Sequence, residues 1–250
     1  MRPAVTNKAL RAPSDWQAMT HGDFLQQQIS SAVEEWLPRL IGYYMLTLGP
    51  LAKGLDLSAS SCRHQLTVHD QKDADLITHL HQLPFQTDSV DACVLPLCLD
   101  FSSDPHQMLR EAHRIVIPDG HLLIAGCNPL SLLMLGKLSP SHRKVAPWNG
   151  RFFTSHRMKD WLQLLGCEVV AEQTTGYSSL MGKHTRHEGF HQFGQKFAPW
   201  AGSIYLILAK KREVPLTPIR PSWQTSRQMK PVNVLSGAGV AGRGFRQLRR

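Results

Sequence analysis

Apolar positions along this chain recur with two periods, one typical of helices and one typical of buried strands. Residues 24–37 have a period near 3.6, which predicts an amphipathic helix that Pro38 should end or kink. Its apolar face consists of Phe24, Leu25, Ile29, Ala32, Val33, Trp36 and Leu37. The run YYMLTL (43–48) then predicts a buried strand closing at Gly49, and two further strands are expected at 64–68 and 75–78.

The next stretch predicts a strand, a helix and another strand. LPFQTDSVDACVLPLCL (83–99) indicates a turn followed by a strand from Ala92. Asp104 is expected to cap a helix with Pro105 at its first position and Gln107 completing a capping box. The helix has an apolar stripe of Met108, Leu109, Ala112, Ile115 and Val116. PDG (118–120) predicts a turn before a strand at 121–125.

Further elements follow the same alternation. A short apolar helix is expected over 130–138, where it forms core or lines a lid over a lipophilic substrate. Thr154 or Ser155 opens another helix that Gly166 should stop, with strands at 167–171 and 203–209. Strands that alternate with helices predict an α/β fold with a mostly parallel sheet covered on both faces.

Positive charge is concentrated at the C-terminal end of the chain. The formal net charge is +9, but residues 1–210 carry 19 basic and 18 acidic side chains, whereas residues 211–250 carry nine and one. Pro215, Pro218 and Pro221 recur at the period of polyproline II, and the rest of this tail is poor in apolar residues. We therefore expect an N-terminal extension (1–22), one domain (23–212) and a disordered basic tail (213–250), which could contact nucleic acid.

The cysteines and the N-terminus favour a cytoplasmic protein. The five cysteines form no CxxC pair, which is typical of buried thiols in a reducing compartment. The first residues contain no apolar signal segment, and the run LSLLML (130–135) is too short to cross a bilayer. No membrane span is expected.

Residues 83–126 resemble the second half of a class I S-adenosylmethionine-dependent methyltransferase domain of the type 11 kind. The matching features, in chain order, are Leu83-Pro84-Phe85, Ser89-Val90-Asp91, Asp104-Pro105, Leu109-Arg110-Glu111, Pro118-Asp119-Gly120 and Leu122-Leu123-Ile124. Similarity downstream extends the resemblance to roughly residues 24–223. It implies a Rossmann-like, open, doubly wound sheet of seven strands, whose last strand (203–209) runs antiparallel to the others.

The resemblance also implies a cofactor site. The family's glycine-rich turn follows the first strand; here Gly49 remains, Thr47 replaces the usual acid, and Pro50 removes a backbone donor. Asp70, 21 residues after Gly49, is expected to bind the ribose.

The rest of that site is placed by the Leu83-Pro84-Phe85 anchor and by the fourth strand. His79 with Leu80 is expected to contact the adenine, and Leu97 to face the sulfonium. The connection from Gly49 to His64 has 14 intervening residues, which is short for a full covering helix.

Other candidate groups have less support. His184, His187 and His191 with Glu188 match no standard zinc spacing, so a polar loop and no metal site is expected. Asp100 is either a base or substrate-orienting group, or an ordinary acid at a helix N-terminus or in a turn. The sequence LPLCLDF after the fourth strand argues against methylation of nucleobase amino groups. No catalytic residue is assigned.

Three functional hypotheses remain open. The leading one is an S-adenosylmethionine-dependent methyltransferase acting on a small-molecule or otherwise unknown acceptor. The changes at Thr47, Pro50 and His79 motivate the second, a non-catalytic binding or scaffold protein on the same fold. The third is a nucleic-acid-associated protein that binds phosphates through the basic tail.

Overall fold

The computed structural model describes residues 10, 12–131, 136–137, 142, 145–177 and 199–213, which belong to a unit ending at Val214. The described helices are α1 (Gly22–Glu34), α2 (Cys98–Phe101), α3 (Pro105–Ile115) and α4 (Ser155–Leu164), with 3-10 turns η1 (Leu37–Arg39), η2 (Pro50–Gly54) and η5 (Pro199–Ala201). The strands are β1 (Tyr44–Leu48), β2 (His64–His69), β3 (Leu76–Ile77), β4 (Val90–Pro96), β5 (Val116–Cys127), β6 (Cys167–Thr175) and β7 (Ile204–Lys211).

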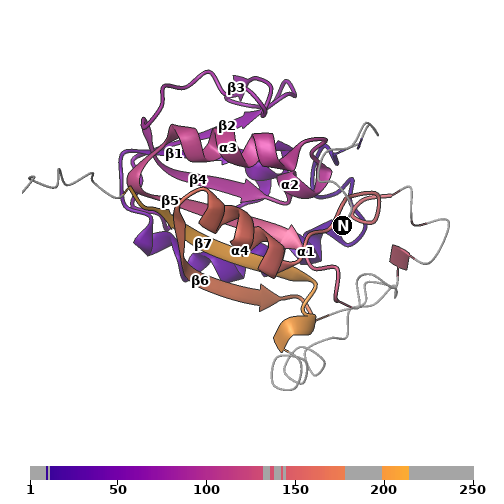
Figure 1. The fold of residues 1–250 in the computed structure, drawn as a ribbon. Helices are drawn as coiled ribbons and strands as arrows, with labels where there is room; N and C mark the ends of the chain where they lie inside the picture. Colours follow the sequence, from indigo (N-terminus) through magenta and orange to yellow (C-terminus); the bar gives the residue numbers. More distant parts are fainter. Residues whose placement is uncertain are drawn as a thin grey trace, which may run out of the picture. The chain divides into compact units, whose positions relative to one another are not determined.

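The strands form one seven-stranded sheet in the order β3-β2-β1-β4-β5-β7-β6 (Figure 1). Strands β1 to β5 pair in parallel, whereas β7 pairs antiparallel with both β5 and β6. This confirms the open, doubly wound α/β fold and the antiparallel last strand that the resemblance implied. The strand order reverses between β1 and β4, where such sheets bind their ligands.

Helices cover both faces of the sheet. Figure 1 shows α3 and α4 on one face and α1 on the other. Along β1, Met45 packs in the same apolar cluster as α1, whereas Leu46 and Leu48 pack in the cluster that contains the apolar faces of α3 and α4. This alternation follows from the two-residue period of a strand, and it buries both faces of β1.

The predicted starts of α3 and α4 are confirmed, with one correction. The Asp104 carboxylate accepts a hydrogen bond from the Gln107 N–H at 3.0 Å, and the Thr154 hydroxyl accepts one from the Arg157 N–H at 3.2 Å. The capping box is only half formed, because the Gln107 side chain donates to the His81 carbonyl at 3.4 Å instead of turning back to the cap. Gly166 ends α4 with a positive φ of 81°, as expected.

Several boundaries differ from the prediction. Helix α1 ends at Glu34, three residues before the predicted end at Leu37. Pro38 lies in the 3-10 turn η1 that follows. The PDG turn does not interrupt β5, which begins at Val116 and continues to Cys127, with a register shift against β4. Strand β6 extends to Thr175 because β7 pairs with its whole length.

The connection between β1 and β2 is as short as expected and contains only the five-residue η2. Other expectations lie outside the described residues: most of the apolar helix over 130–138, the cluster His184, His187, Glu188 and His191, and the basic tail from residue 214 on. Among the helices that the structure describes, none has the length and apolar content to cross a bilayer.

Candidate cofactor site

A cavity of about 930 Å³ opens beyond the carboxyl ends of the central parallel strands. Four of the five predicted cofactor residues line it, namely Asp70, His79, Leu80 and Leu97. Gly49 is not part of the lining, but its neighbours Pro50 and Leu51 are. The fold therefore brings together residues from four separate segments, at the position where the strand order reverses.

Gly49 makes the turn that leads from β1 into η2. Its backbone has φ 96° and ψ 163°, a conformation that L side chains rarely adopt. Its N–H donates to the Val68 carbonyl at 2.9 Å. A Cβ added here would lie 3.0 Å from the Cβ of Cys98, so the turn needs glycine for conformation and for close packing against α2.

Asp70 and His79 are both exposed and stand on either side of β3. Asp70 directly follows β2, and the Thr78 N–H returns to donate to the His69 carbonyl at 3.0 Å. Leu80 is half-buried beside His79 in a turn closed by a 3.0 Å bond from the Gln82 N–H to the His79 carbonyl. The Asp70 carboxylate is therefore available to a polar ligand, with an imidazole and an apolar side chain along the same cavity.

Leu97 is fully buried at the end of β4 and has left-handed backbone angles, φ 55° and ψ 4°. Its N–H donates to the Ala125 carbonyl at 2.9 Å, and its carbonyl accepts from the Asp100 N–H at 3.2 Å. Positive φ is uncommon outside glycine and clusters at functional sites when the surroundings enforce it. Here it turns the chain from the strand into α2 at the wall of the cavity.

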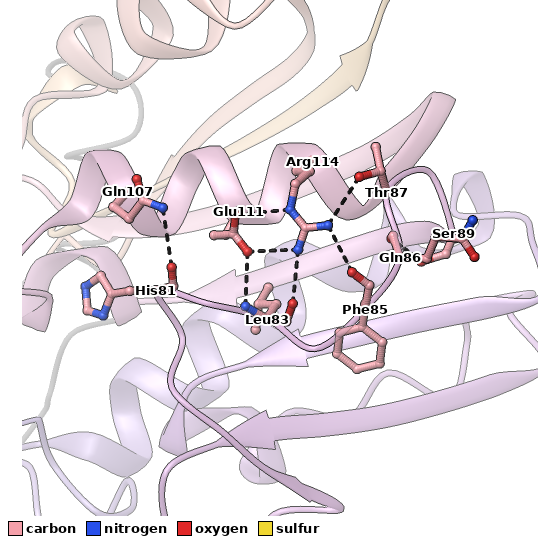
Figure 2. A network of polar contacts seen from close by, with 9 residues as sticks. All are labelled: His81, Leu83, Phe85, Gln86, Thr87, Ser89, Gln107, Glu111 and Arg114. Atoms are coloured by element: carbon pink, nitrogen blue, oxygen red, sulfur yellow. Dashed lines mark hydrogen bonds and ion pairs between the residues drawn. The ribbon is translucent and has the colours of Figure 1, made fainter.

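A polar network explains the family pattern around Leu83-Pro84-Phe85 (Figure 2). The Arg114 guanidinium donates to the carbonyls of Leu83 at 3.0 Å and Phe85 at 2.9 Å, and pairs with Glu111 at 2.9 Å. Glu111 also accepts from the Leu83 N–H at 3.0 Å, and hydrogen bonding from Arg114 lowers the pKa of this carboxyl. The network binds the turn to α3 and so positions the preceding cavity residues, His79 and Leu80.

His81 and Ser102 line the same cavity but were not singled out in the sequence. The Nε2 atom of His81 lies 2.9 Å from the Ser102 hydroxyl oxygen. No sequence pattern marks His81 as a site residue in preference to His79. Ser102 is one of two adjacent serines after α2, and no pattern distinguishes it from the other. The only available signal was the position of His81 beside the expected adenine contact.

Asp100 lies outside the cavity lining and is almost fully buried. Its Oδ2 accepts a hydrogen bond from the Cys127 N–H at 2.8 Å, while Oδ1 has no hydrogen-bond partner among the described residues. Burial raises the pKa of Asp100 to about 8. In this position it connects α2 to the end of β5 and does not contact the cavity.

The two changes in the glycine turn have different locations. Thr47 is buried and lines a separate cavity of about 310 Å³, together with Ala52, Lys53 and Thr67. Pro50 lines the main cavity. Thr47, which stands where the family has an acid, therefore lies away from the main cavity. Pro50, which lacks a backbone N–H, lies at the wall of the main cavity.

Comparisons with known proteins agree with the fold. A family model described as "Methyltransferase domain", of type 11, matches residues 42–124, which extend from just before β1 into β5. The uncharacterized protein YafS of Escherichia coli (strain K12) is 34% identical over 218 residues, covering 87% of this chain and 88% of YafS. Malonyl-[acyl-carrier protein] O-methyltransferase 1 of Coxiella burnetii is 37% identical over 84 residues, covering 33% of this chain and 28% of that protein.

A solved structure of an S-adenosylmethionine-dependent methyltransferase from Thermotoga maritima has the same fold. It superposes with a TM-score of 0.54 at 17% identity, covering 76% of this chain and 92% of that one. The sheet order, the matched domain and the similarity to YafS over most of both chains lead to one conclusion. This chain belongs to the type 11 methyltransferase-domain family.

Proposed function

We propose that this protein is an S-adenosylmethionine-dependent methyltransferase. The observation that carries the proposal is the open cavity at the reversal of strand order, lined by Asp70, His79, Leu80 and Leu97. The side chains most able to block such a site do not fill it: Thr47 lines the other cavity and His79 is exposed. Gly49 forms the tight turn that leads Pro50 and Leu51 to the wall of this cavity.

Each residue has a distinct role in this proposal. Asp70 accepts hydrogen bonds from the ribose hydroxyls, and His79 with Leu80 contacts the adenine through a ring nitrogen and an apolar surface. Leu97 forms an apolar wall near the reacting groups. The cofactor, when bound, supplies a methyl group on a sulfonium that is its own leaving group.

The rest of the cavity would hold the acceptor. Its lining includes Phe101, Met108 and Ala146, which exclude water and favour an apolar body. Among the described lining residues, Asp70 is the one carboxylate, and there is no lysine or arginine. We therefore propose an acceptor that is uncharged near its reactive atom.

Proton removal completes the transfer. An acceptor hydroxyl or amine that gains a methyl group releases a proton, and a neutral imidazole nitrogen of His81 can accept it. Ser102 would orient that ring through the 2.9 Å contact. Positioning and exclusion of water account for the remaining acceleration.

Titration calorimetry of the full chain with S-adenosylmethionine and S-adenosylhomocysteine tests the proposal. We expect saturable binding of both and a methylated product when the protein is given a small-molecule extract and labelled cofactor. Absence of heat at millimolar ligand would overturn the enzyme assignment.

The second candidate is a binding or scaffold protein on the same fold, favoured by Pro50 at the cavity wall, where a backbone donor is lost. Such a protein would show no methyl transfer to any extract fraction.

The nucleic-acid hypothesis concerns residues outside the described part of the chain. If a chain truncated after residue 212 binds RNA or DNA as well as the full chain does, the tail has no such role.

A further inference from the structure

The N-terminal segment, expected to be an extension outside the domain, forms part of the cavity. Ala12, Pro13, Ser14 and Ala18 line it together with the loop residues Pro50 and Leu51. A backbone hydrogen bond of 3.0 Å from the Thr20 N–H to the Ala146 carbonyl joins the segment to a second lining region. Residues 12–20 are therefore a wall of the site.

Trp16 connects this wall to η2. Its side chain is 4% exposed, and its indole N–H donates to the Leu51 carbonyl at 2.9 Å. The indole passes so close to Gly54 that a Cβ there would lie 2.2 Å from the Trp16 Cδ1 atom. Gly54 thus has a packing reason to be glycine, and Trp16 is both a packing element and a hydrogen-bond donor.

Gln26 holds the other end of the same turn. Its side-chain amide extends from α1 and donates to the Gly54 carbonyl. Together, Trp16 and Gln26 bind carbonyl groups at the second and fifth residues of η2, so that this short turn is held at both ends from outside.

External support matters here because η2 is a short 3-10 turn. It contains five residues, and backbone bonds of 3.1 Å at its two ends run from the Ala52 N–H to the Gly49 carbonyl and from the Leu55 N–H to the Ala52 carbonyl. Short 3-10 turns have poorer hydrogen-bond geometry than α-helices. A loop of this kind, with Pro50 in place of a backbone donor, does not rigidify itself as a glycine turn followed by a long helix does.

We propose that Trp16 and Gln26 are positioning residues for the cofactor: by fixing η2, they hold Pro50 and Leu51 at the wall of an open cavity. This inference rests on the proposed function, because the cofactor is the ligand that the loop receives. The N-terminal segment and α1 thereby compensate for the missing glycine-rich helix start, and the cofactor site includes residues that precede the matched methyltransferase domain.

The test uses the full chain and three variants, Trp16→Phe, Gln26→Met and Val33→Ala. The first two each remove one of the two side-chain donors that hold η2, which we call the clamp (Trp16 and Gln26). Both variants keep much of the side-chain volume. Val33 is buried in the same apolar cluster as Trp16 but makes no bond to η2, so its variant controls for lost stability alone. Each protein is measured by thermal unfolding, by calorimetric titration with S-adenosylhomocysteine, and by hydrogen exchange at the Ala52 and Leu55 amides without ligand.

We expect Trp16→Phe and Gln26→Met each to weaken S-adenosylhomocysteine binding roughly two- to tenfold, the ratio that corresponds to one net hydrogen bond. The Ala52 and Leu55 amides should exchange faster in both. Val33→Ala should lower the unfolding temperature and leave the affinity within about twofold of the wild type.

Equal affinity in the wild type and both clamp variants overturns the inference, as does an equal loss of affinity in Val33→Ala. If Trp16→Phe does not fold, Gln26→Met decides the question. If the wild type does not bind S-adenosylhomocysteine, the proposed function fails, whereas unchanged exchange at Ala52 and Leu55 in the variants refutes the clamp itself.

Discussion

His81 and Ser102 are joined by a 2.9 Å contact between Nε2 and the hydroxyl oxygen, which links the segment after β3 to the end of α2. Both residues line the main cavity. If His81 takes up the proton that the methylated molecule releases, His81→Asn should reduce methyl transfer by about 10²- to 10⁴-fold, the usual contribution of a general base. Ser102→Ala should cause a smaller loss.

The measurement is incorporation of labelled methyl groups into a small-molecule extract, alongside calorimetric affinity for S-adenosylhomocysteine. The affinity should stay within about twofold in both variants, because the role lies in proton transfer and not in cofactor binding. A loss of affinity equal to the loss of transfer would contradict this assignment.

The Asp70 carboxylate is expected to account for much of the cofactor affinity. Asp70→Asn should weaken S-adenosylmethionine binding about 10- to 100-fold, because hydrogen bonds to a charged group contribute about 1.5–3 kcal/mol. Asp73→Asn is the matched control: it removes a nearby exposed carboxylate that lies outside the main cavity lining. Equal affinities of the two variants in calorimetry would remove Asp70 from the site.

Gly49→Ala should lower the free energy of unfolding by about 1–3 kcal/mol, because the new side chain meets both a positive φ and a close neighbour. Gly166→Ala provides the comparison, since its φ is 81° but the nearest atom to an added Cβ is 3.6 Å away. Urea unfolding of both variants should give the larger loss at Gly49. The opposite order would show that contact with Cys98 is unimportant.

The contribution of Glu111 to stability should depend on pH. Hydrogen bonding from Arg114 lowers the pKa of Glu111 below its ordinary value of 4.5, so the folded chain holds the ionised form more strongly than the unfolded chain does. The stabilisation is therefore complete above pH 4.5 and is lost as the pH falls through the folded pKa. Urea unfolding of wild type and Glu111→Gln from pH 7 to 3 should show their difference shrinking only below about pH 4.5.

Asp100 should have the opposite effect. Burial raises its pKa from 3.8 to about 8, so the folded chain binds a proton that the unfolded chain has released between these values. The wild type should lose stability relative to Asp100→Asn as the pH rises from about 4 to 8, and the difference should then level off. A flat difference across this range in urea unfolding would mean that the buried carboxylate is ionised in the folded protein.

Local patterns predicted much of the fold. The cap of α3 at Asp104, the start of α4 at Thr154 and the end of α4 at Gly166 each depend on residues within a few positions, and all three are confirmed. The sequence predicts a turn at PDG and a strand only from His121, whereas β5 already begins at Val116. Val116 already pairs with Val90 of β4, and at PDG the register against β4 shifts and Asp119 has a φ of 63°. No local signal records that early pairing with β4.

The site depended more on tertiary structure. Asp70, His79, Leu80 and Leu97 were identified from family spacing, but their presence around one cavity follows from the sheet order. The pair His81 and Ser102 and the clamp from Trp16 to Leu51 join residues 21 and 35 positions apart in the chain, with no motif to announce them.

The sequence by itself determined the alternation of strands and helices, because this depends on periodicity. Its short ordered motifs carried the resemblance to the family, and that resemblance implied the antiparallel last strand. Only the tertiary structure decided that the altered glycine turn borders an open cavity, and that the N-terminal segment supplies one of its walls. The physical reason is that cavities and clamps form between segments, where side-chain volume and hydrogen bonds from distant residues meet, and the spacing of residues within one segment contains no record of that meeting.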